Sequence, residues 1–182
     1  MRAGFVVCQW ALVMFMLAAG AQAAEFKHPT PYDDLMTEFA RQHHLPTSLV
    51  RAMVKTESGY NRYAISPKGA QGLMQLMPDV SRRYNVSDPY NAKENIRAGT
   101  AYFREMLDRF ESLTLALAAY NIGPETVERC HCVPRVDETQ LFVKSVINNY
   151  NKFRREIDSK APLLLLKKDL SGVYLTKRPR KR

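Results

Sequence analysis

Residues 92–110 read AKENIRAGTAYFREMLDRF, and this stretch decides the fold class. Its large apolar side chains recur at helical spacing, as in an amphipathic helix that packs on a core. They are Ile96, Phe103, Met106, Leu107 and Phe110. Asn91 and Glu94 at its start resemble a capping box. The sequence therefore predicts a long helix, Ala92–Phe110, with one buried face.

The segments on either side of this stretch also favour helices, with no internal repeat or low-complexity linker between them. Leu113–Tyr120 is almost entirely apolar, which is typical of a central helix with little exposed surface. Gly123-Pro124 ends it and begins a short helix to Arg129. Further helices are predicted at 33–42, 47–57, 73–77, 78–84 and 138–153. The last is expected to bury Leu141, Phe142, Val146, Ile147 and Tyr150. A chain of 182 residues with this pattern is expected to form one mainly α domain.

Residues 1–23 have the features of a secretory signal peptide. Arg2 is the only charge before an apolar run from Phe5 to Ala19, and Ala21-Gln22-Ala23 fits a cleavage site. The run is shorter than the roughly 20 residues of a membrane-spanning helix, although an uncleaved anchor is the alternative. We expect residues 1–23 to be removed, residues 24–156 to fold, and the protein to be periplasmic.

The chain is strongly basic, with 27 Lys and Arg against 18 Asp and Glu. Many of these cations lie in a C-terminal tail, residues 157–182, and a run of this kind is usually solvated. The net charge of +9 favours anionic partners. For an exported chain these are an acidic polymer or lipid headgroups rather than nucleic acid. Membrane contact is expected only through the signal peptide or the tail.

Two cysteines remain after cleavage, in Cys130-His131-Cys132. Export permits a disulfide, and a local disulfide or free thiols are favoured over an intermolecular disulfide. A zinc site ordinarily needs about four ligands, so metal binding is the last alternative. No metal and no cofactor are expected.

Glu57 is the candidate catalytic acid. It follows Met53 by four residues and Val54 by three, which places it at the edge of the apolar face of helix 47–57. Desolvation there would raise its pKa, and a protonated carboxyl can protonate a glycosidic oxygen. Side chains that suit sugar binding follow: Tyr60, Asn61, Tyr63, Gln71 and Gln75. Taken alone, a glutamate near a helix end is more often a solvated charge.

Several short motifs accompany Glu57 in a fixed order. They are Glu57-Ser58, Gly59-Tyr60-Asn61, Ala64-Ile65-Ser66, Lys68-Gly69-Ala70, Gly72-Leu73-Met74-Gln75-Leu76-Met77-Pro78 and Ala118-Ala119-Tyr120-Asn121-Ile122-Gly123-Pro124. This ordered set resembles the catalytic domain of the soluble lytic transglycosylases over about Tyr32 to Phe153. The resemblance implies a lysozyme-like fold of about seven helices with a substrate cleft. It also implies cleavage of the β-1,4 bond between N-acetylmuramic acid and N-acetylglucosamine in peptidoglycan, with a 1,6-anhydro ring on the muramoyl product.

The resemblance also implies roles for individual residues. Glu57 matches the single catalytic acid/base, and Ser58 matches the serine beside it. The remaining matches are to substrate-binding positions: Met74, Gln75, Tyr120 and Asn121. A conventional hydrolase would need a second carboxylate about 5–10 Å away. Asp79, Asp88 and Glu94 are available by type, but no motif supports them.

Two departures from the family pattern concern the last third of the chain. Phe142 stands where the family typically has a tyrosine after its Glu-Thr pair, and Cys130–Pro134 replaces a loop that is usually glycine-rich. The small size resembles specialised members that serve secretion or conjugation machines. The competing interpretations are a lysozyme-type hydrolase and a non-catalytic peptidoglycan-binding module of such a machine.

Overall fold

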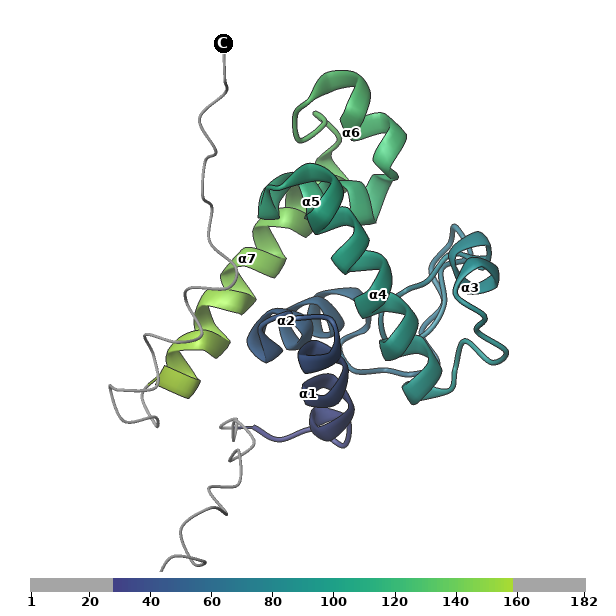
Figure 1. The fold of residues 1–182 in the computed structure, drawn as a ribbon, viewed down its shortest axis with the longest axis vertical. Coiled ribbons are helices and arrows are strands. Elements are labelled where there is room, and N and C mark those ends of the chain that lie inside the picture. Colours follow the sequence, from purple (N-terminus) through teal and green to yellow (C-terminus); the bar gives the residue numbers. More distant parts are fainter. Residues whose placement is uncertain (1–27, 159–182) are drawn as a thin grey trace, which may run out of the picture.

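The computed structural model describes residues 28–158 as an assembly of α-helices (Figure 1). The helices are α1 Asp33–Gln42, α2 Thr47–Ser58, α3 Pro78–Arg83, α4 Ala92–Phe110, α5 Leu113–Ile122, α6 Pro124–Cys130 and α7 Asp137–Asp158. β pairing within this range is limited to two isolated antiparallel bridges, Ile65 with Gln71 and Gln71 with Leu76. The predicted mainly α fold class is confirmed. The predicted signal peptide and nearly all of the basic tail lie outside the described residues.

The long helix α4 has the predicted bounds because both of its ends are capped. The Asn91 side chain accepts hydrogen bonds from the backbone N–H groups of Lys93 and Glu94. The other half of a capping box is not formed, since the Glu94 carboxylate accepts from the N–H of Ser87 instead. At the other end Glu111 adopts a left-handed conformation and its N–H bonds back to the Leu107 carbonyl.

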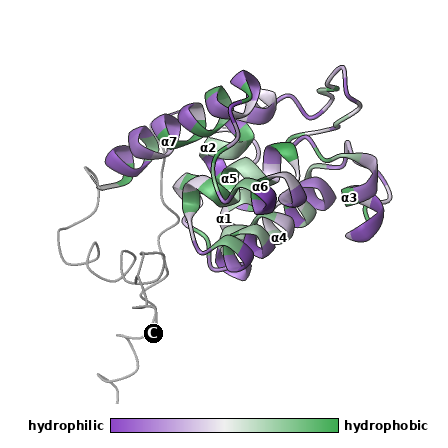
Figure 2. Cartoon of the chain, turned by 90° about the horizontal axis from the view of Figure 1, so that it is seen from above, coloured by the Kyte–Doolittle hydropathy of each residue, from purple (hydrophilic) through white to green (hydrophobic). Residues whose placement is uncertain are grey.

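The core lies where α2, α4 and α5 meet, and α7 covers it from one side. Residues 116–120 of α5 are buried, as expected for a central helix. α7 packs along α2 and also contacts α5, while α5 packs on α4 and α6. In Figures 1 and 2, α7 and α3 lie at opposite sides of the molecule. Hydrophobic and hydrophilic residues alternate along α7 in Figure 2, which agrees with one face packing on the core.

A buried arginine of α2 contacts residues of α1 and α7. Arg51 of α2 is only 1% exposed and forms an ion pair with Asp33 of α1. Its guanidinium carbon also lies 5.1 Å from the ring centroid of Phe153 in α7. A buried cation needs such partners, because desolvation without them is costly.

Two local predictions are wrong. Residues 73–77 are not a helix, because Gly72 and Gln75 have positive φ angles and the backbones of Gln71 and Leu76 pair with each other. Leu141 is 63% exposed, whereas its neighbours Phe142 and Val143 are buried, so α7 presents an adjacent stripe to the core. Among residues 28–158, no helix is both long and apolar enough to cross a membrane.

Candidate active site

Glu57 lies in the last turn of α2, immediately before the helix ends at Gly59. Gly59 adopts a left-handed conformation (φ 59°), which glycine tolerates best. Burial of the Glu57 carboxyl, followed by the negative charge of Glu138, raises its pKa from 4.5 to about 8. The direction is the one expected from desolvation, so the protonated acid is favoured at neutral pH.

Glu138, in the first turn of α7, is the second carboxylate that acts on Glu57. It pairs with Lys68 Nζ at 2.5 Å, and both side chains of this pair are exposed. The sequence analysis missed it, although it belongs to the Glu-Thr pair noted there.

The three carboxylates considered from the sequence have other partners. Asp79 pairs with Arg82, Asp88 accepts the N–H of Tyr90, and Glu94 accepts the N–H of Ser87. None of the three is among the causes of the pKa shift of Glu57.

Tyr120 lies near the end of α5 and is almost fully buried. Its hydroxyl donates a hydrogen bond of 2.8 Å to the Met74 carbonyl. Burial, and then the charge of Glu57, raise the Tyr120 pKa well above its ordinary value. Tyr120 therefore remains a neutral phenol that lies near Glu57 and holds the loop between α2 and α3.

Asn121 follows Tyr120 and connects α5 to the start of α7. Its Oδ1 accepts a hydrogen bond of 2.8 Å from the hydroxyl of Thr139, which is buried. Thr139 is the neighbour of Glu138, so this bond also helps to place the Glu138 side of the site.

Met74 and Gln75 lie in the α2–α3 loop, residues 59–77, and both contribute to its internal structure. The Met74 side chain is fully buried; a Cβ added to Gly99 of α4 would lie only 2.5 Å from its sulfur. The Gln75 amide nitrogen donates to the carbonyls of Ala64 (3.0 Å) and Gly72 (2.9 Å). The surface methionine of this motif is instead Met77, which is 43% exposed and which the sequence analysis did not select.

Ser58 is the last residue of α2. Its hydroxyl donates to the Val54 carbonyl (3.0 Å) and accepts the N–H of Tyr60 (3.2 Å). These bonds fix the chain direction directly after Glu57.

Asn95 of α4 holds the α2–α3 loop in place and was also missed. It is fully buried; its Oδ1 accepts the Met74 N–H at 2.7 Å, and its Nδ2 donates to the carbonyls of Gln71 (3.0 Å) and Pro89 (2.8 Å). Gly72 (φ 82°) passes so close that a Cβ there would lie 2.3 Å from Asn95 Nδ2. The sequence offers one signal for the role of Asn95. This polar residue lies four positions before Gly99 and therefore on the same face of α4, which packs inward.

The two departures noted in the sequence have simple structural descriptions. Phe142 is buried in the core, so the packing at this position is kept without a hydroxyl. A disulfide joins Cys130, the last residue of α6, to Cys132, with their Cα atoms 5.1 Å apart. Within residues 28–158, no cluster of three or more His, Cys, Asp or Glu side chains could hold a metal ion.

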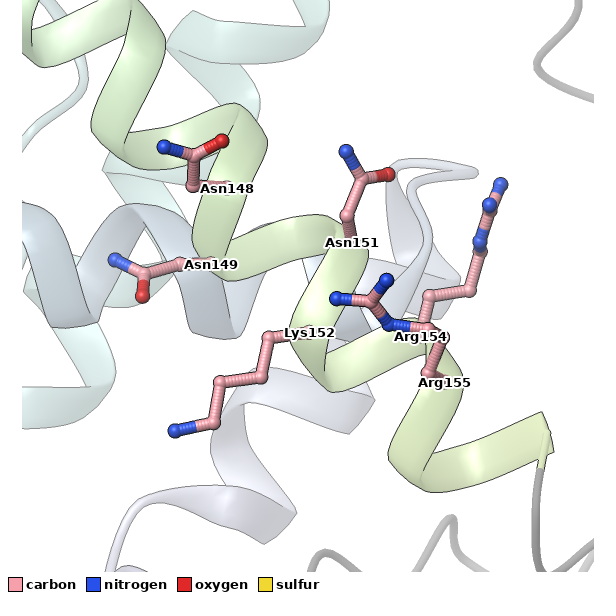
Figure 3. A pocket seen from close by; sticks show the side chains of 6 residues that line it. All are labelled: Asn148, Asn149, Asn151, Lys152, Arg154 and Arg155. Atoms are coloured by element: carbon pink, nitrogen blue, oxygen red, sulfur yellow. The ribbon is translucent and has the colours of Figure 1, made fainter.

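A polar pocket lies along the C-terminal half of α7 (Figure 3). Amide and basic side chains line it: Asn148, Asn149, Asn151, Lys152, Arg154 and Arg155. Asn148 lies ten positions after Glu138 in the helix, which corresponds to about 15 Å along the axis. The pocket lining includes no carboxyl group to act as an acid, so Glu57 and its neighbours remain the candidate active site.

Comparisons with known proteins agree with this arrangement. The transglycosylase of Enterobacteria phage PRD1 is 43% identical over 82 residues, which cover 45% of this chain and 31% of the phage protein. The soluble lytic murein transglycosylase of Salmonella typhimurium is 30% identical over 164 residues, covering 77% of this chain and 25% of that protein. This chain therefore spans only a minor part of these relatives.

A solved structure shares the fold. The structure of an inactive mutant of the lytic transglycosylase Slt from Pseudomonas aeruginosa superposes with a TM-score of 0.63 at 27% identity, covering 71% of this chain and 25% of that one. A model of the transglycosylase SLT domain matches residues 34–135, more than half of the 182 residues. The matched range includes Glu57, the α2–α3 loop and Tyr120, and the chain belongs to the transglycosylase SLT domain family.

Proposed function

We propose that this protein is a peptidoglycan lytic transglycosylase that cleaves the β-1,4 bond between N-acetylmuramic acid and N-acetylglucosamine. The observation that carries the proposal is the pKa of Glu57, raised to about 8 in a member of the transglycosylase family. A carboxyl that is protonated at neutral pH can act as the general acid that glycosidic cleavage requires.

In the proposed mechanism, Glu57 serves first as acid and then as base. Its proton passes to the glycosidic oxygen while the bond from that oxygen to C1 of the muramoyl sugar breaks. The substrate's own N-acetyl group stabilises the positive charge that develops at C1. The Glu57 carboxylate then removes the proton of the C6 hydroxyl as this oxygen bonds to C1, which forms the 1,6-anhydro ring and restores the acid without consuming water.

The neighbours of Glu57 have supporting roles in this proposal. Tyr120 and Asn121 stand at the end of α5, where the first holds Met74 and the second bonds to Thr139. Ser58 sets the chain direction after Glu57, and Gln75 stiffens the loop on which substrate contacts depend. Met74 acts through packing, because its side chain is buried.

A lysozyme-type hydrolase is the second candidate, and Glu138 is the observation that favours it. Its charge acts on Glu57, as a second carboxylate would in a conventional glycosidase. The ion pair with Lys68 argues against this role, because it keeps Glu138 engaged at the surface. A non-catalytic module that only binds peptidoglycan is the third possibility that an experiment must separate.

Product analysis separates these candidates. Purified protein is incubated with peptidoglycan sacculi and the soluble products are analysed by mass spectrometry. Anhydro-muropeptides support the proposal, reducing-end products indicate the hydrolase, and bound but intact sacculi indicate the binding module. Glu57→Gln should lower the rate by about 10²–10⁴-fold. Glu38→Gln, at an exposed carboxylate on α1, is the matched control and should leave the rate unchanged.

The proposal also includes the export of the protein, its domain boundaries and its partner. Residues 1–23 would direct export to the periplasm and be removed, residues 24–156 would form the catalytic domain, and residues 157–182 would be a basic tail. A secretion or conjugation machine is the proposed partner, since such an assembly must pass the cell wall. Comparing the periplasmic and cytoplasmic fractions of cells that express the protein tests the export step.

A further inference from the structure

Two large apolar side chains stand out on the surface of the α2–α3 loop. Tyr63 is 64% exposed and Ile65 is 62% exposed, and neither belongs to the hydrophobic core nor packs against it. Single exposed apolar residues are common on protein surfaces, but groups of them mark binding sites. Tyr63 and Ile65 would mark a binding site only as part of a larger surface.

Tyr90 and Gln71 connect these side chains. The ring centroids of Tyr63 and Tyr90 are 6.0 Å apart with an interplanar angle of 40°, and the Gln71 amide donates to the Tyr90 hydroxyl at 3.1 Å. Gln71 pairs with Ile65 in an antiparallel bridge, and directly paired residues project to the same side. The Arg62 guanidinium lies over the Tyr63 ring, 4.9 Å from its centroid. We call the surface formed by Arg62, Tyr63, Ile65, Gln71 and Tyr90 the Tyr63 platform.

The platform is held by the same bonds that hold the loop of the candidate active site. The Gln71 N–H and carbonyl both pair with Leu76, each at 2.9 Å, and the Gln71 carbonyl also accepts from Asn95. Asn95 in turn binds the Met74 N–H, and Met74 is the residue that Tyr120 anchors. A surface fixed in this way loses little conformational freedom when a ligand binds.

The composition of the platform matches the chemistry of an N-acetylated sugar chain. Tyrosine rings offer rigid, amphipathic faces on which the apolar face of a sugar ring can lie. The Gln71 amide, the Tyr90 phenol and the Arg62 guanidinium can bond to hydroxyl and acetamide groups, while Tyr63 contributes its ring. Arg62 gives the platform a positive charge that attracts the acidic groups of peptidoglycan.

We propose that the Tyr63 platform is an additional binding site for the glycan strand, which holds sugars beyond those bound at Glu57. This inference rests on the proposed function, because it takes the same polymer as its ligand. A protein partner would also bury an aromatic surface. However, Asn95 bonds both to Gln71 of the platform and to Met74 of the loop beside Glu57, and this shared support favours one ligand that contacts both places.

The test measures binding without cleavage, using the full chain with Glu57→Gln and oligomers of N-acetylglucosamine of increasing length. Calorimetry should show that Tyr63→Ala lowers the affinity for long oligomers by about three- to tenfold and leaves short oligomers unchanged. Tyr63→Phe is the matched control: it keeps the ring and should keep the affinity. The melting temperature should not change, because Tyr63 is outside the core.

Other outcomes would overturn the inference. If Tyr63→Ala binds every length as well as its parent, the platform does not hold glycan. If it loses short and long oligomers equally, Tyr63 belongs to the site at Glu57. The failure of the proposed function is separate: a length-dependent loss of binding on Tyr63→Ala, together with no anhydro products from the parent protein that keeps Glu57, would refute the lyase activity and leave the platform standing.

Discussion

At the scale of single residues, the proposed chemistry depends on the protonation of Glu57. The helix end places its carboxyl in a desolvated position, and the nearby charge of Glu138 adds to the effect. Both influences disfavour the carboxylate, so one side chain can serve as acid before the bond breaks and as base afterwards. Tyr120 contributes a neutral neighbour rather than a charge.

The pKa of Glu57 predicts the pH range of activity. In the proposed mechanism the protonated form of Glu57 starts the reaction, and a raised pKa extends that form to higher pH. We therefore expect kcat/KM to fall as pH rises through about 8, rather than near the ordinary value of 4.5. The measurement is the rate of sacculus solubilisation between pH 5 and pH 10. A midpoint below pH 6 for this alkaline loss would contradict the assignment.

At the scale of elements, the decisive one is the α2–α3 loop, which has little regular structure of its own. Its shape comes from contacts with α4 and α5: Asn95 bonds to two of its backbone groups, and Tyr120 bonds to a third. Gly72 allows the close approach to Asn95. These bonds hold the loop against α4 and α5.

Replacing Asn95 tests this dependence. Asn95→Ala leaves the Met74 N–H and the carbonyls of Gln71 and Pro89 without their partner. We expect the free energy of unfolding to fall by about 2–4 kcal/mol, since each unsatisfied buried group costs about 1–3 kcal/mol. Urea denaturation measures this change. Asn148→Ala, at an exposed position of α7, should stay within about 0.5 kcal/mol of the parent; equal effects of the two substitutions would disprove the role of Asn95.

At the scale of the whole molecule, the packing of α7 on α2 brings the start of α7 near the end of α2 that carries Glu57. Glu138 thereby reaches a position where its charge acts on Glu57, and Lys68 of the α2–α3 loop pairs with it. Residues 70 positions apart in sequence thus set the electrostatics of one site.

The Lys68–Glu138 pair is expected to shift the pH profile without affecting stability. Glu138→Gln removes a like charge, so the pKa of Glu57 falls and the alkaline loss of activity moves to lower pH. Lys68→Met leaves the Glu138 charge unpaired, and the loss should move to higher pH. The pair is exposed, so either change should alter the free energy of unfolding by less than about 1 kcal/mol. Shifts of both profiles in the same direction would contradict this coupling.

Local patterns in the sequence predicted the helices well, because apolar periodicity and capping residues act within a few positions along the chain. α4 has the predicted bounds. The observed ends of α1–α3 and α5–α7 lie at most five residues from their predicted positions. The short segment 73–77 failed, because bonds from Asn95 and Tyr120 outweigh its local preference for a helix. Leu141 failed because helical spacing does not specify which adjacent stripe meets the core.

The sequence by itself determined the helical fold class, the family resemblance and the choice of Glu57, since motifs and periodicity are properties of the chain read in order. The tertiary structure alone decided that Glu138 acts on Glu57, that Met74 is buried while Met77 is exposed, and that Asn95 holds the loop. Burial and electrostatic coupling depend on which distant segments come together in space. That arrangement results from packing, and the spacing of residues along the chain does not predict it.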